Sequence, residues 1–111
     1  MPKLNRQELG HSQEYLPALA FLLKSLGDEN RLKILFALYN GKKSVSGIVE
    51  ELGLSQPLVS HHLKELRRAL LVNVERSGPF IYYELADGKI LDILKSLEGL
   101  TVSLLSKRKT F

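Results

Sequence analysis

The chain has 111 residues, a formal net charge of +4 and no cysteine. This length predicts a single domain over residues 1–111, and the lack of cysteine excludes disulfides, thiolate metal sites and thiol redox sensing. With 44% hydrophobic and 25% charged residues the chain has an ordinary globular composition, which excludes disorder, while the excess of Lys and Arg weakly favours an anionic partner.

The N-terminal part is expected to form an arm followed by a helix. Residues 1–13 are interpreted as a loose arm, and no apolar stretch is long enough for a signal peptide or a membrane span, which predicts a cytoplasmic protein. The helix is expected to begin near Tyr15, because proline is tolerated in a first turn and the chain has Pro17. Leu16, Leu19 and Leu23 then fall on one stripe.

Three polar residues predict three helix starts in the next part of the chain. Asp28 is expected to cap a helix that runs through Tyr39 and is apolar enough to lie in the core. Ser44 and Ser55 are expected to cap two short helices, residues 45–52 and residues 56 to about 70. A glycine-containing turn joins the last two, which predicts a helix-turn-helix over residues 44–70.

The second helix of this pair is predicted to have one buried and one exposed face. Val59, Leu63, Leu66 and Leu70 recur at helical spacing and are expected to be buried. Gln pairs with adenine, Ser and His adapt to several bases, and Lys and Arg suit phosphates. We therefore expect DNA contacts from the cap and the opposite face; a solvated face is the alternative. The residues are Ser55, Gln56, Pro57, Ser60, His61, Lys64, Arg67 and Arg68.

Residues 72–85 are predicted to form a β-hairpin. Apolar and polar residues alternate on both sides of the turn at residues 77–79, as in two paired strands. A hairpin directly after a recognition helix is a wing. Arg76 near its tip is expected to reach phosphate or the minor groove, or else to pair with Glu75 or Glu84.

Residues 87–106 are predicted to form a last helix with more apolar surface than a small core needs. Exposed apolar stripes of this size mark association surfaces, so we expect a symmetric homodimer through the first and last helices. Packing within one chain is the alternative. The expected interface residues are Leu16, Leu19, Leu23, Leu94, Leu97 and Leu104.

These elements predict a mainly α fold with a β-hairpin wing, a winged helix-turn-helix that is dimeric through its N- and C-terminal helices. The expected function is sequence-specific binding of double-stranded operator DNA by a transcriptional regulator, most simply a repressor on an inverted repeat. No constellation of catalytic residues is visible, so an enzyme is not expected. The alternative is a winged-helix protein-interaction module that has lost specific DNA binding.

Three segments resemble the ArsR/SmtB family of bacterial and archaeal repressors. Residues 26–35 read LGDENRLKIL, with the Asp and Arg that the family has before an apolar helix. Residues 54–66 read LSQPLVSHHLKEL, its recognition-helix signature, and residues 81–85 read IYYEL, similar to its closing strand. The resemblance spans about residues 18–95. It implies a homodimer that represses its operon by blocking access to the promoter, and a structural role for His62.

The two metal sites that the resemblance implies are not preserved. Ser44, Val45 and Ser46 stand where many members have Cys-Val-Cys, and neutral hydroxyls are poor ligands for soft metals. At the second site the residues are Asp87, Lys89, Leu100 and Ser103, and Lys89 would repel a cation. We expect no metal and no cofactor. The effector stays open: a small organic molecule, a metal at an unrecognised site that could include His11, or none. Pro79 stands where the wing often has a basic residue.

Overall fold

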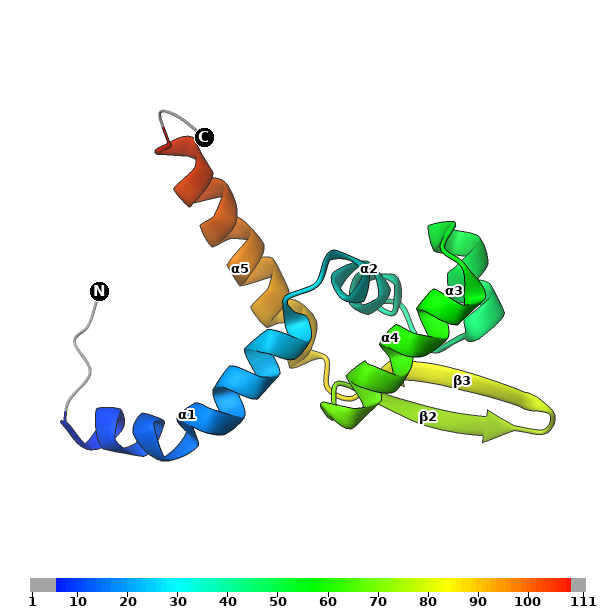
Figure 1. Ribbon diagram of the computed structural model, residues 1–111, viewed down its shortest axis with the longest axis horizontal. Helices are drawn as coiled ribbons and strands as arrows, with labels where there is room; N and C mark the ends of the chain where they lie inside the picture. Colours follow the sequence, from blue (N-terminus) through cyan, green and yellow to red (C-terminus); the bar gives the residue numbers. More distant parts are fainter. Residues whose placement is uncertain (1–5, 109–111) are drawn as a thin grey trace.

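The computed structural model describes the backbone of residues 6–108 and the side chains of residues 13–108. Figure 1 shows α2, α3 and α4 gathered beside a long hairpin, with α1 and α5 projecting from the opposite end in different directions. This arrangement confirms the predicted winged helix-turn-helix. The elements are α1 (Arg6–Leu26), α2 (Glu29–Ala37), β1 (Lys43–Ser44), α3 (Val45–Leu52), α4 (Gln56–Arg68), β2 (Val72–Ser77), β3 (Phe80–Leu85) and α5 (Lys89–Ser106).

Side-chain caps start three of these helices at the expected places. Asp28 Oδ1 accepts a hydrogen bond from Arg31 N at 3.0 Å, Ser44 Oγ from Gly47 N at 3.1 Å and Ser55 Oγ from Leu58 N at 3.3 Å. Each bond satisfies a backbone donor that the first helical turn leaves free. Gly53 ends α3 in the left-handed conformation, with φ 67°. Ser44 and Ser55 therefore cap α3 and α4 directly before their first residues.

The wing belongs to a three-stranded antiparallel sheet in the described part of the chain, with strand order β1-β3-β2. Ser77 pairs with Phe80 across the turn, and Gly78 adopts φ 62° there. β1 was not predicted, because its two residues are too few to give a sequence pattern. Its residues pair with Tyr83 and Tyr82, so the start of α3 is tied directly to the wing.

The core lies between the helix-turn-helix, α2 and the base of the wing. Ile34, Ile48, Val59, Leu63 and Leu66 have no exposed surface, which supplies the main hydrophobic contribution to folding. The remaining core residues are Leu26, Leu35, Leu38, Leu71, Val72 and Leu94. Among the described residues, no helix is long and apolar enough to cross a membrane.

The prediction of a helix start near Tyr15 is wrong, and so is the predicted arm for residues 6–13, while residues 1–5 lie outside the described part of the chain. α1 begins at Arg6, and Pro17 lies inside it. Proline removes the hydrogen bond to the carbonyl four residues earlier and typically bends a helix. Gln13, which carries that carbonyl, is exposed, so water can satisfy it. Figure 1 shows the resulting bend in α1.

The prediction that Leu70 is buried is also wrong. Its side chain is 81% exposed and its φ is 63°, because α4 ends at Arg68 and the chain reverses. Leu71 N donates to Leu66 O at 2.9 Å, the bond of a Schellman motif. Leucine occupies the left-handed position that usually favours glycine, and Leu71 enters the core in place of Leu70.

Candidate nucleic-acid interface

The surface of α4 divides as the sequence predicts. Val59, His62, Leu63 and Leu66 are buried against the core. The predicted contact residues at the cap and on the other face are all exposed and lie together along one helix. They are Ser55, Gln56, Pro57, Ser60, His61, Lys64, Arg67 and Arg68. Hydrogen-bonding groups occupy the first turns and cations the last ones, which is the order needed to read bases and hold phosphates.

The charge of this face is positive. The first turn of α4 has no acidic residue and the last turn contains Arg67 and Arg68. Arg68 Nη1 lies 3.4 Å from Glu65 Oε1, which offsets part of its charge. Lys64 and Arg67 form no ion pair with any described residue. The N-terminal end of the helix adds a partial positive charge from its macrodipole, so the face can attract phosphates.

The wing presents Arg76 near its tip. It pairs with Ile81 across the hairpin and is exposed. The suggested ion pair with Glu75 does not form, because Lys42 Nζ lies 2.9 Å from the Glu75 carboxylate. Within the described residues Arg76 has no ion-pair partner. Its guanidinium is therefore available to a phosphate.

No sequence pattern indicates a role for Lys42, which is 33 residues from Glu75. Its ammonium also lies 5.5 Å from the centre of the Tyr82 ring, and the hydrogen bond to Glu75 raises the pKa of Lys42. Phe80 at the tip was also missed. Its side chain is 58% exposed and its ring centre lies 6.3 Å from that of Tyr82. The tip of the wing thus presents the cationic side chain of Arg76 and the apolar ring of Phe80 to solvent.

His62 lies on the buried side of α4, as the family resemblance implies. It is 6% exposed, and its Nε2 is 3.8 Å from Asp28 Oδ1. Among the described residues its Nδ1 has no hydrogen-bond partner. Burial lowers the pKa of His62, and this effect outweighs the nearby Asp28 carboxylate, which raises it. The imidazole is therefore neutral at pH 7.

This lowered pKa predicts a loss of stability in acid. Four groups face the imidazole: Asp28 and Arg31 from the start of α2, and His61 and Glu65 from α4. The unfolded state binds more protons than the folded state once the pH falls below the ordinary histidine pKa of about 6.5. The free energy of unfolding should therefore fall as the pH falls from that value toward the lower pKa of the folded state.

Urea unfolding at a series of pH values measures this effect, with His62→Gln as the control because Gln does not titrate. The wild type should lose more stability than the variant between about pH 6.5 and pH 5. Asp28, whose pKa is lowered mainly by the hydrogen bond from Arg31 N, affects stability only near and below about pH 4. Parallel curves for the two proteins would contradict the assignment to His62.

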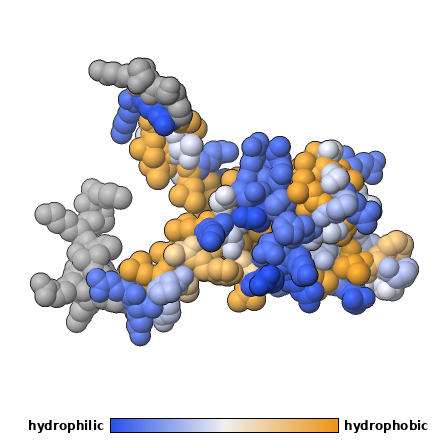
Figure 2. Space-filling model, viewed as in Figure 1, coloured by the Kyte–Doolittle hydropathy of each residue, from blue (hydrophilic) through white to orange (hydrophobic). Residues whose placement is uncertain are grey.

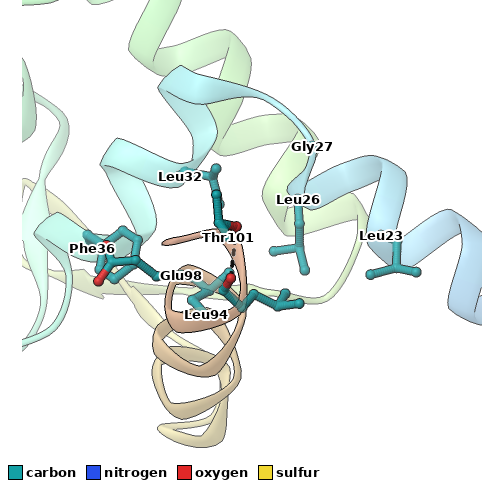
Figure 3. A pocket seen from close by; sticks show the side chains of 9 residues that line it. Leu23, Leu26, Gly27, Leu32, Phe36, Leu94, Glu98 and Thr101 are labelled. Atoms are coloured by element: carbon teal, nitrogen blue, oxygen red, sulfur yellow. Dashed lines mark hydrogen bonds between the residues drawn. The ribbon is translucent and has the colours of Figure 1, made fainter. Parts of the chain in front are cut away.

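A pocket of about 360 Å³ lies where α1, α2 and α5 meet. Figure 3 shows Leu23 and Leu26 from α1, Leu32 and Phe36 from α2, and Leu94, Glu98 and Thr101 from α5 around it. Thr101 Oγ1 donates to Leu97 O at 2.8 Å, so its proton is already used. Glu98 forms no ion pair with a described residue. The pocket is an apolar space with one unpaired carboxylate at its edge.

The exposed sides of α1 and α5 carry the leucines predicted for a dimer interface. Leu16, Leu19, Leu23, Leu97 and Leu104 are between 40% and 56% exposed. Leu94 differs from them, because it is 4% exposed and belongs to the core of the same chain. Figure 2 shows hydrophobic atoms along both projecting helices. These helices leave an apolar surface that a single chain does not cover.

Ser44 and Ser46, which stand where many family members have the two cysteines of a metal site, form structural hydrogen bonds here. Ser44 Oγ caps α3 and lies 3.2 Å from Ser46 Oγ. No group of three or more His, Cys, Asp or Glu that could hold a metal occurs among the described residues. The side chain of His11, suggested as part of an unrecognised site, lies outside the described residues.

We predict that zinc, cobalt, cadmium and arsenite bind stripped protein no more tightly than an adventitious histidine surface does. The reason is that Ser44 and Ser46 stay neutral near pH 7, whereas metal-binding thiols ionise. Isothermal titration of each metal into the protein measures the affinity. The His11→Gln variant is the control, because it shows whether His11 contributes to any binding. Stoichiometric binding at micromolar concentration would contradict the prediction.

Comparisons with known proteins agree with this geometry. The family model described as "Bacterial regulatory protein, arsR family" matches residues 28–74. An uncharacterized HTH-type transcriptional regulator of Methanocaldococcus jannaschii is 37% identical over 82 residues, which cover 73% of this chain and 92% of the relative. The HTH-type transcriptional repressor SmtB of Mycobacterium tuberculosis is 39% identical over 74% of this chain and 61% of its own length. The crystal structure of NolR from Sinorhizobium fredii superposes with a TM-score of 0.72 at 29% identity, over 90% of this chain and 96% of that one.

Proposed function

This chain belongs to the ArsR family of bacterial regulatory proteins, and we propose that it is a transcriptional repressor that binds an inverted-repeat operator as a homodimer. The observation that carries the proposal is the exposed face of α4, where Gln56, Ser60 and Lys64 lie in one row opposite the buried side. The protein is not an enzyme in this proposal, and it acts in the cytoplasm, where operator DNA lies.

In this function α4 enters the major groove. Its first turns bring Gln56 and Ser60 to base edges, because side chains near the start of a recognition helix reach deepest into the groove. Lys64, Arg67 and Arg68 contact phosphates, and Arg76 on the wing reaches the backbone or the minor groove. Ser55, Pro57 and His61 complete the contact surface.

The exposed leucines of α1 and α5 support the homodimer. A symmetric dimer buries the same patch on both chains and removes the apolar surface from water. It also places two copies of α4 on one side of the DNA, about one helical turn or 34–36 Å apart. Blocking of the promoter by this dimer is the simplest route to repression.

Fluorescence anisotropy with the promoter upstream of the protein's own gene tests the proposal. We expect tight binding to this DNA, and displacement by the same unlabelled sequence but not by an equal excess of scrambled DNA. Equal competition by both would favour the alternative, a winged-helix interaction module without specific DNA binding.

Phosphate contacts predict a steep dependence on salt. Lys64→Gln and Arg67→Gln should each weaken binding on any DNA sequence and reduce the slope of log K against log salt by about one unit. Lys95→Gln, on α5, is the control, because it removes the same charge outside the proposed interface. Titrations between low and physiological salt measure the slopes. Slopes equal to that of the wild type in both α4 variants would place the phosphates elsewhere.

We also propose that the effector is a small organic molecule that occupies the pocket between α1, α2 and α5. Its volume and apolar walls suit such a ligand, and the unpaired Glu98 favours one with a positively charged group. Native mass spectrometry of the purified dimer tests for a bound molecule. A ligand retained by the wild type and lost in Glu98→Gln supports this assignment, and a ligand-free wild type from its own host opposes it.

A further inference from the structure

A chain of polar contacts joins the dimer-forming part of the molecule to the recognition helix. It begins at the last turn of α1, where Arg31 Nε donates to Ser25 O at 2.6 Å and Arg31 Nη2 to Lys24 O at 3.2 Å. The last carbonyls of a helix have no partner within the helix. A planar guanidinium that bonds two neighbouring carbonyls fixes both the position and the orientation of the α1 end.

The next contact is made by Asp28, just before α2. Its Oδ1 accepts the hydrogen bond of Arg31 N, which holds the pKa of the carboxyl below its ordinary value, so Asp28 is ionised. The same oxygen lies 3.8 Å from His62 Nε2. This separation exceeds a direct hydrogen bond, and because the imidazole is neutral the attraction is that of the carboxylate charge for the dipole of the ring.

The protonation of His62 follows from its two nitrogens. Nδ1 has no partner among the described residues, and a buried donor without an acceptor is costly. The proton of the neutral ring therefore lies on Nε2, facing the Asp28 carboxylate. The pair orients the imidazole, and with it the buried side of α4, relative to the start of α2.

We propose that Arg31, Asp28 and His62 form a joint that sets the orientation of α4 relative to α1 and so fixes the half-site spacing that the dimer accepts. The inference rests on the proposed function, because it assumes that α1 takes part in the dimer and that α4 reads DNA. The leucine core also connects these helices, but apolar contacts are non-directional. The polar contacts of Arg31, Asp28 and His62 depend on direction, so they fix the angle between these helices.

The length of α1 makes this orientation matter. Measured along its axis, the 21 residues of α1 extend about 30 Å, with a bend near Pro17. A small rotation where α1 meets α2 therefore moves the far end of α1 by several ångströms, and the two recognition helices of a dimer shift relative to each other. Weakening the joint should broaden the range of spacings that the dimer tolerates.

The experiment measures the affinity of the full chain for operators whose central spacer is shortened or lengthened by one or two base pairs. The test variants are His62→Leu, which removes the Nε2 donor, and Arg31→Lys, which replaces the two-point contact by a single one. His62→Gln is the conservative variant, because its amide nitrogen can reach the place of Nε2. Sedimentation establishes that each variant is dimeric.

We expect the wild type to prefer one spacing by about tenfold over the altered ones, an ordinary coupling energy. His62→Leu and Arg31→Lys should reduce this preference to within about threefold while nonspecific affinity and the dimer are retained. His62→Gln should keep most of it. A merely structural role would weaken binding at all spacings alike.

The possible negative results distinguish a failure of the proposed joint from a failure of the proposed function. An unchanged spacing preference in both test variants, or a uniform loss at every spacing, contradicts the joint. If His62→Leu fails to fold, Arg31→Lys decides the question, because the cap from Asp28 to α2 remains. If the wild type binds no inverted repeat, the proposed function fails and the joint fails with it.

Discussion

Leu97→Glu should dissociate the dimer and lower operator affinity by about a hundredfold or more, the usual gain from linking two binding modules. Leu97 is 40% exposed on α5, in the stripe that also contains Leu104. A carboxylate in the symmetric interface would be buried twice, once from each chain, with no partner to compensate it. The monomer would keep α4 intact but would contact a single half-site.

Sedimentation velocity and fluorescence anisotropy measure the two effects on the same samples. Leu104→Glu should behave like Leu97→Glu. Lys95→Glu is the matched control, because it places a carboxylate on α5 about half a turn away from Leu97. It should leave the dimer intact. If both leucine variants sediment as dimers, the interface lies on another surface.

The parts of the fold that depend on local signals were predictable. Ser44 and Ser55 stand directly before apolar residues at helical spacing, and each side chain caps the helix that it predicts. Capping is decided within three residues, so the sequence pattern contains the whole cause. The alternation in β2 and β3 is a local signal of the same kind.

The errors arise where the local preference is overridden by other contacts. Pro17 favours a helix start, yet α1 passes through it, because an exposed helix can replace one backbone bond with water. Leu70 continues the apolar spacing of α4, yet a left-handed turn puts Leu71 into the core instead. A leucine at that turn has no sequence signature, since glycine is the usual residue there.

The candidate interface was predictable to the same extent. A single helix determines which side chains share a face, so Gln56, Ser60 and Lys64 could be grouped from their spacing alone. The bond between Lys42 and Glu75 joins distant residues, and the bonds from Arg31 to α1 depend on the angle between two helices. The spacing of residues along the chain predicts neither the Lys42–Glu75 bond nor the bonds from Arg31 to α1.

Gln56→Ala and Ser60→Ala should each cost roughly 1–3 kcal/mol on the specific operator and relax the preference at one or two base positions. Both side chains are exposed on the first two turns of α4, where base edges come within reach. Gln can make two hydrogen bonds to adenine, and the alanine variant leaves those groups on the base without a partner. The double variant should approach the nonspecific affinity of the wild type.

Binding to operators with every single-base substitution measures these preferences. Nonspecific affinity and the salt slope should stay unchanged, because neither residue carries charge, and this separates base reading from damage to the fold. Asn40→Ala, in the exposed turn after α2, removes an amide side chain away from the proposed DNA and dimer interfaces and should change nothing. Unchanged affinity and base preference in both α4 variants would mean that another face of the molecule reads the DNA. Because the other face of α4 is buried in the core, the wing, where Arg76 and Phe80 are exposed, would then be the next surface to test for base reading.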